Sequence, residues 1–146
     1  MSSQEAITQD QVMPLLLNAC PTFREVWDSS ENQDLLYVCL GGFAHHLLHM
    51  YKERRTDEFP AVCEVIERLH LEGTCYVKEA ATVGFLEGVQ NAWADEVAPE
   101  EFFRFLLPES RKWWKELNDF WDGKIPHLGA GLSGERDVGD PRQIRT

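Results

Sequence analysis

Histidines at helical spacing are the residues whose types and positions come closest to a metal site in this chain. His45 and His49 stand four residues apart, which would place both on one face of a helix, as in helical zinc sites. Glu67 and His70 form one E-x-x-H, half of the pattern used by di-iron bundles. A di-iron site needs that pattern twice, and the chain has no second E-x-x-H. We therefore predict partly buried, hydrogen-bonded histidines and no metal site, and leave open whether these four residues meet in space.

Other patterns that could support catalysis are incomplete. The chain has neither a G-x-S-x-G nucleophile elbow nor a G-x-x-x-x-G-K phosphate loop. Residues 129–134 spell G-x-G-x-x-G, but no strand is expected before them and no helix after them, so the spacing is attributed to chance. We predict no catalytic residues, no cofactor and no enzymatic activity.

The cysteines are scattered along the chain and form no CxxC pair; they are Cys20, Cys39, Cys63 and Cys75. Each lies in an apolar helical context, where a free cysteine behaves as a small hydrophobic residue. The first residues, Met-Ser-Ser-Gln-Glu, do not resemble a signal peptide. We therefore expect reduced thiols and a cytoplasmic protein.

Charge is the remaining chemical feature. The net charge of −11 opposes binding to nucleic acid and to anionic membranes, and it favours a basic partner. Residues 79–103 contain no Lys or Arg. A solvated face that keeps the protein soluble is one explanation, and a docking surface is the other. On the second, the partner-binding residues are Glu79, Glu87, Asp95, Glu96, Glu100 and Glu101, with Trp93 as an apolar anchor that could equally pack in the core.

The elements that must position these residues all have helical patterns. Residues 35–51 lack charged side chains, but this stretch is short for a bilayer and contains histidines and Gly41-Gly42. We interpret it as a central helix surrounded by others, in which the two glycines let a neighbouring helix approach closely. Six other helical segments are expected, at residues 8–20, 22–27, 56–72, 74–93, 99–107 and 108–122.

Helix-start and helix-stop residues delimit these segments. Capping boxes are expected at Thr8 and Thr22, and N-caps at Asp34, Thr56 and Thr74. Gly73 should end one helix in the left-handed conformation that glycine favours after a helix. The prediction is an all-α, irregular bundle of about six to seven helices in residues 1–123, followed by a flexible Gly/Pro-rich tail at 124–146. Its buried residues should include Leu36, Leu40, Phe43, Leu47, Leu86, Trp114 and Leu117.

Two motifs carry a resemblance to a known family. They are Ile66-Glu67-Arg68-Leu69 continuing through Glu72-Gly73, Tyr76-Val77, Ala81 to Glu87 and Gln90-Asn91, and Leu107-Pro108-Glu109-Ser110 followed by Trp113-Trp114 and Leu117-Asn118. Up to Trp121 the chain resembles an uncharacterised family of small bacterial helical proteins associated with immunity to polymorphic toxins. It departs from that family at Gly88, where relatives often have an acidic residue.

The resemblance implies a protein that binds and neutralises a cognate toxin with a basic face, and it supplies no catalytic residues. The competing classes are a small enzyme or metal-binding helical bundle, and an adaptor that has no toxin partner. A toxin gene directly upstream would separate these classes.

Overall fold

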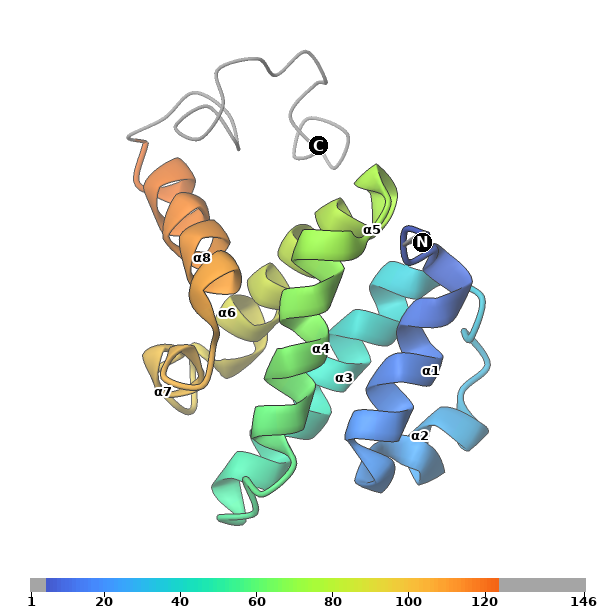
Figure 1. The fold of residues 1–146 in the computed structure, drawn as a ribbon. Helices are drawn as coiled ribbons and strands as arrows, with labels where there is room; N and C mark the ends of the chain where they lie inside the picture. Colours follow the sequence, from blue (N-terminus) through green and yellow to red (C-terminus); the bar gives the residue numbers. More distant parts are fainter. Residues whose placement is uncertain (1–4, 124–146) are drawn as a thin grey trace.

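The computed structural model describes residues 5–123, and these residues form a helical bundle (Figure 1). The tail predicted at 124–146 lies outside the described residues. Elements in chain order are α1 (Gln9–Ala19), η1 (Pro21–Phe23), α2 (Arg24–Ser29), α3 (Leu36–Lys52), α4 (Phe59–Glu72), α5 (Cys75–Glu79), η2 (Ala80–Leu86), α6 (Glu87–Trp93), α7 (Glu100–Phe103) and α8 (Pro108–Trp121). Within the described part, the β-structure consists of one isolated bridge between Ile7 and Gly73. The all-α prediction is confirmed.

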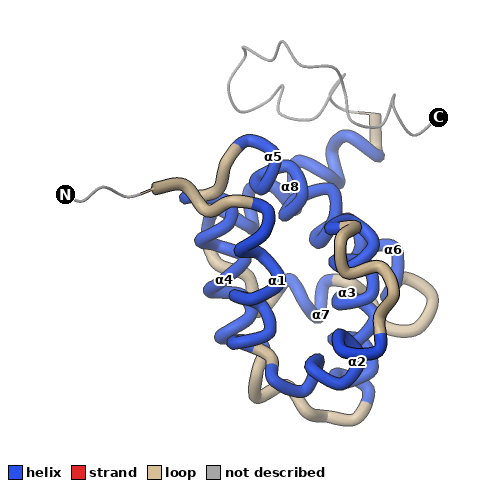
Figure 2. The backbone as a smooth tube through the Cα atoms, turned by 90° about the vertical axis from the view of Figure 1, so that its right-hand side faces the viewer, coloured by secondary structure: helices blue, strands red, loops and turns tan. Residues whose placement is uncertain are grey.

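The core lies where α3 packs against the continuous helical run formed by α5, η2 and α6. Phe43 of α3 meets Phe23 edge-on, with ring centroids 5.0 Å apart, and contacts Phe85 of η2. Helices α1 and α4 pack against each other (Figure 2), and α8 packs on α4 and η2 at the edge of the bundle (Figure 1). All seven residues predicted to be buried are buried: Leu36, Leu40, Phe43, Leu47, Leu86, Trp114 and Leu117.

Helix α3 is central, but other helices do not surround it on all sides, contrary to the prediction. Val38 is 51% exposed, and His45 and His49 are also exposed. Every helix in residues 5–123 is too short or too polar to cross a membrane.

The close approach predicted at Gly41-Gly42 occurs at Gly41, since a Cβ built on Gly88 of α6 would lie 3.9 Å from Gly41 Cα, but the glycines of α3 are not what permits it. Within the described residues, a Cβ on Gly41 or Gly42 would meet no atom within 4 Å. By contrast, a Cβ on Gly84 of η2 would lie 3.0 Å from Leu40 Cδ1. The glycines that face α3 closely are therefore Gly84 of η2, against the Leu40 side chain, and Gly88 of α6, against Ala44.

Helix starts follow the sequence signals in part. The backbone N–H of Thr8 donates to Gln11 Oε1 (2.9 Å), and Thr74 Oγ1 accepts from the backbone N–H of Val77 (3.2 Å), as predicted. The N-caps expected at Asp34 and Thr56 are wrong, since Leu35 precedes α3 and Glu58 precedes α4. The capping box at Thr22 is also wrong, because its hydroxyl bonds to distant residues described below.

Gly73 ends α4 as predicted, but for a different reason. Its φ of −76° and ψ of 162° are extended values that any residue can adopt. The backbone there runs beside Ile7, whose N–H donates to Glu72 O (2.9 Å) and whose carbonyl accepts from Thr74 N–H (3.0 Å). A Cβ at Gly73 would lie 2.5 Å from Leu69 O, so lack of space, and not a left-handed conformation, favours glycine at this position.

The helix predicted at 74–93 contains a π-helical segment, η2, that the hydrophobic pattern did not indicate. The N–H of Glu87 donates to Thr82 O, five residues back, in place of the usual four. All seven residues of η2 are buried. The wider turn shifts the residues that follow it around the helix axis, so an α-helical projection misassigns their faces.

Candidate functional site

The histidines that could have formed a metal site lie in separate parts of the fold. His45 and His49 are exposed on α3, and His49 Nε2 is 3.2 Å from Glu53 Oε2 in the next turn. Glu67 and His70 belong to α4 and face α8. Among residues 5–123, no three His, Cys, Asp or Glu side chains are placed to hold a metal ion. The E-x-x-H pattern thus has another use in this structure.

Glu67 caps the N-terminus of α8. Its Oε2 accepts from the backbone N–H of Glu109 (2.9 Å), and its Oε1 accepts from the backbone N–H of Ser110 (3.0 Å). The Ser110 hydroxyl also donates to Glu67 Oε1 (3.0 Å). A carboxylate is well suited to this place, because the first N–H groups of a helix lack partners and carry partial positive charge.

His70 extends this network to η2. The Ile66 carbonyl can only accept, so Nδ1 carries the proton that it donates to Ile66 O (3.1 Å) and shares with Ser110 Oγ (3.2 Å). Nε2 is then an acceptor for the Thr82 hydroxyl (2.9 Å). Burial lowers the pKa of His70 to about 4, although the Ile66 carbonyl and Glu67 favour the charged form. The imidazole is therefore neutral at pH 7.

This arrangement does not provide a catalytic serine. The Ser110 hydroxyl already donates to Glu67, and His70 presents a proton, not a lone pair, to Ser110. His70 is 4% exposed and Ser110 is fully buried, so a substrate cannot reach them in this fold. The network of Glu67, His70, Thr82 and Ser110 is structural and joins α4, η2 and α8.

A second polar cluster, missed in the sequence, joins η1, α3 and the start of α4. The Thr22 hydroxyl donates to Glu58 Oε1 (2.7 Å), so His46 Nε2 must donate to Thr22 Oγ1 (2.8 Å). The Cys20 thiol donates to the same Glu58 oxygen (3.0 Å). Sequence spacing gave no signal for this cluster, because its members come from three segments and match no motif.

This cluster holds η1, α3 and the start of α4 together and presents no reactive group. Burial and then Glu58 raise the pKa of Cys20 to about 12, so its sulfur remains a thiol and not a nucleophilic thiolate. Burial lowers the pKa of His46. Because the single hydroxyl proton of Thr22 is directed at Glu58, the side chains of Thr22, Glu58 and His46 hold one another in place.

The predicted partner-binding residues divide into buried and exposed groups. Glu87 is 1% exposed and Trp93 is fully buried, so their assignment to a docking surface is wrong. Trp93 packs edge-on against Phe102 (centroids 5.5 Å apart), and its Nε1–H donates to Ala44 O (3.2 Å), as expected of a core residue. Glu87 directly follows η2, whose seven residues are all buried as well. Glu79, on α5, is half-buried.

Of the other four acids, Asp95 and Glu96 follow α6, and Glu100 and Glu101 begin α7; we call Asp95, Glu96, Glu100 and Glu101 the acidic turn. Its charge is partly balanced by residues distant in sequence. Lys52 at the end of α3 forms an ion pair with Glu96 and lowers the pKa of that carboxyl. Glu101 accepts from the Tyr51 hydroxyl (2.9 Å) and lies 3.4 Å from Arg104. The absence of Lys and Arg from residues 79–103 therefore overstates the negative potential here.

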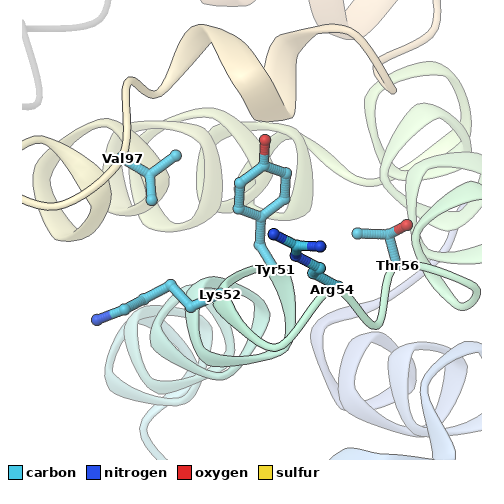
Figure 3. A pocket seen from close by; sticks show the side chains of 5 residues that line it. All are labelled: Tyr51, Lys52, Arg54, Thr56 and Val97. Carbon is cyan, nitrogen blue, oxygen red and sulfur yellow. The ribbon is translucent and has the colours of Figure 1, made fainter.

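A surface hollow lies beside the acidic turn and is lined by Tyr51, Lys52, Arg54, Thr56 and Val97 (Figure 3). Arg54 has a φ of 63°, the left-handed conformation that usually favours glycine at the end of a helix. Arg55 N–H donates to Met50 O (2.9 Å) and holds this turn. Because Lys52 and Arg54 are exposed, the hollow is an uneven part of the surface and not a pocket that encloses a ligand.

Comparison with known proteins gives a family but not an activity. The model of a family described as a domain of unknown function (DUF7674) matches residues 13–122, from within α1 to the end of α8. Comparisons with curated proteins and with solved structures gave no match. The matched segment contains both buried polar networks and the acidic turn. The chain therefore belongs to the DUF7674 family of domains of unknown function.

Proposed function

We propose that this protein is a cytoplasmic immunity protein that binds and neutralises a cognate toxin through the acidic turn. The observation that carries the proposal is the contrast between buried and exposed polar groups. The side chains suited to catalysis are buried and already hydrogen-bonded: His70 to Ser110, and Cys20 to Glu58. Asp95, Glu96 and Glu100 are exposed. Such a surface suits binding to a basic partner and not chemical conversion of a substrate.

The charge balance of the acidic turn is compatible with docking. An exposed ion pair such as Lys52–Glu96 contributes little to stability, so a partner's Lys or Arg could replace Lys52 at small cost. The net charge of −11 would also attract a basic toxin over a longer range. Toxin sites that act on nucleic acids or nucleotides are often basic, which makes an acidic antagonist physically reasonable.

The test is co-purification with the product of the adjacent gene, followed by association rates at two salt concentrations. The variant Asp95→Lys/Glu100→Lys should associate about ten-fold more slowly at low salt and show weaker salt dependence. A matched control is Glu25→Lys/Asp28→Lys, which makes the same charge change at exposed positions of α2. Circular dichroism should show both variants folded.

The outcomes separate the interface from the function. Equal rates for Asp95→Lys/Glu100→Lys and wild type would exclude the acidic turn, and a slower α2 control would move the interface to α2. Binding to a neighbour that does not harm cells would favour an adaptor. If no neighbouring product binds and co-expression protects no cell from a toxin, the immunity proposal is wrong.

A further inference from the structure

Three helical elements meet at one buried imidazole. His70 belongs to α4, Thr82 at its Nε2 belongs to η2, and Ser110 at its Nδ1 belongs to the first turn of α8. Each of these three side chains is at most 4% exposed. Neutral His70 therefore links α8 and η2 to α4 at a point that water does not reach.

A second proton on His70 would introduce a buried charge that Ile66 O, Glu67 and Glu109 compensate only in part. Three charged groups face the ring: Glu67 on α4, Glu109 on α8 and Lys78 on α5. Glu67 already accepts three hydrogen bonds from Glu109 and Ser110, and Lys78 repels an imidazolium. Nε2 would also become a donor facing the hydroxyl that now donates to it. Separation of α8 from α4 would let water solvate the charge.

The rest of the core does not depend on this contact. Trp93 of α6 bonds to the Ala44 carbonyl of α3, and Phe43 packs on Phe85. In contrast, α8 lies at the edge of the bundle and is the last described helix (Figure 1). Edge elements of this kind can open locally while the core remains folded.

We propose that His70 is an acid-sensitive latch, and that its protonation frees α8 from α4 and η2 while the α3–α6 core stays folded. The direction of the effect follows from linkage. Burial holds the pKa of His70 at about 4, below its ordinary value of 6.5, so the closed state binds fewer protons than the open state. Closure is complete above pH 6.5 and weakens as the pH falls. By pH 4 the open:closed ratio should have risen about a hundred-fold.

The five tryptophans allow local and global opening to be distinguished. With 5-fluorotryptophan in the full chain, ¹⁹F NMR would report on Trp113, Trp114 and Trp121 of α8, and on Trp27 and Trp93 elsewhere. Between pH 7 and pH 4 the signal of Trp114, the buried tryptophan of α8, should move toward exposed values before those of Trp27 and Trp93 change, whereas Trp121 is already 54% exposed. A single midpoint for the signals of Trp114, Trp27 and Trp93 would overturn the latch.

Variants test whether His70 is responsible. Thr82→Val removes the donor that favours neutral Nε2, so α8 should open at higher pH than in wild type. His70→Gln cannot gain a charge, and its α8 signals should not change down to pH 4. His49→Gln changes an exposed histidine and should behave as wild type. If His70→Gln does not fold at pH 7, Thr82→Val decides alone. An unchanged midpoint in Thr82→Val, or wild-type opening in folded His70→Gln, would show that His70 does not control α8.

Discussion

Glu67 caps α8 from a different helix: its Oε1 lies 3.0 Å from the backbone nitrogen of Ser110, 43 residues further along the chain. Most N-caps come from the residue that precedes the helix. Here the cap also anchors α8 to α4, so a local requirement of one helix fixes the position of another.

Replacement of Glu67 by Ala should therefore lower the free energy of unfolding by about 1–3 kcal/mol, because two backbone N–H groups and the Ser110 hydroxyl lose their acceptor. Glu64 is exposed on the same helix, and Glu64→Ala should change stability by less than about 0.5 kcal/mol. Urea denaturation at pH 7 measures both. Equal effects of the two substitutions would contradict the capping role.

The Thr22 hydroxyl should contribute to stability through both of its hydrogen bonds. Thr22→Val keeps the shape of the side chain but leaves Glu58 and His46 without that partner, at an expected cost of about 1–3 kcal/mol. Thr22→Ser keeps the hydroxyl and should cost less than half as much. If Thr22→Ser were as unstable as Thr22→Val, removal of the methyl group would cost as much as removal of the hydroxyl, and the hydrogen bonds would not be the main contribution of this residue.

Glycines at two positions should respond in opposite directions to alanine. Gly42 is exposed within α3 and has free space around it, so Gly42→Ala should raise stability by about 0.5–1 kcal/mol. A Cβ at Gly73 would lie 2.5 Å from Leu69 O and 2.6 Å from Val77 Cγ1, so Gly73→Ala should cost about 1–3 kcal/mol. Thermal unfolding followed by circular dichroism distinguishes the two. A stable Gly73→Ala variant would show that this backbone can move.

Thiol reactivity should report burial directly. Cys75 is exposed, whereas Cys20, Cys39 and Cys63 are buried. Burial raises the pKa of Cys20 and of Cys63 to about 12. In Ellman's assay at pH 8, native protein should release one equivalent rapidly and the rest only after unfolding, and Cys75→Ser should abolish the rapid phase.

The raised pKa values of these thiols predict how the stability of the fold changes at alkaline pH. Their folded-state pKa values exceed the ordinary value of 9, so the folded state binds more protons than the unfolded chain above pH 9. Stability should therefore fall as the pH rises from 9 toward 12. Cys63→Ala should reduce the slope of this decline. An unchanged slope in that variant would place the alkaline transition at other groups.

The sequence by itself determined where helices lie, because helix formation depends on signals within a few residues. Thr8 with Gln11 and Thr74 with Val77 are contacts between residues three apart, and both formed as predicted. The spacing of Leu36, Leu40, Phe43 and Leu47 likewise identified the buried side of α3, since a helix repeats about every 3.6 residues. The assignment of Glu87 to a docking surface failed for a different reason, because it rested on charge alone, and a run of acidic residues does not show which of them packing buries.

Only the tertiary structure decided which polar side chains meet. Lys52 reaches Glu96 across 44 residues of sequence, Thr22 reaches Glu58 across 36, and His70 reaches Ser110 across 40. Such pairs depend on how whole helices are oriented, and apolar packing over large surfaces sets that orientation without regard to the polar residues. Packing placed the end of α3 beside the acidic turn, which therefore has a counter-charge that its own stretch of sequence lacks. Packing also placed the start of α8 beside the E-x-x-H, whose Glu67 therefore anchors that helix.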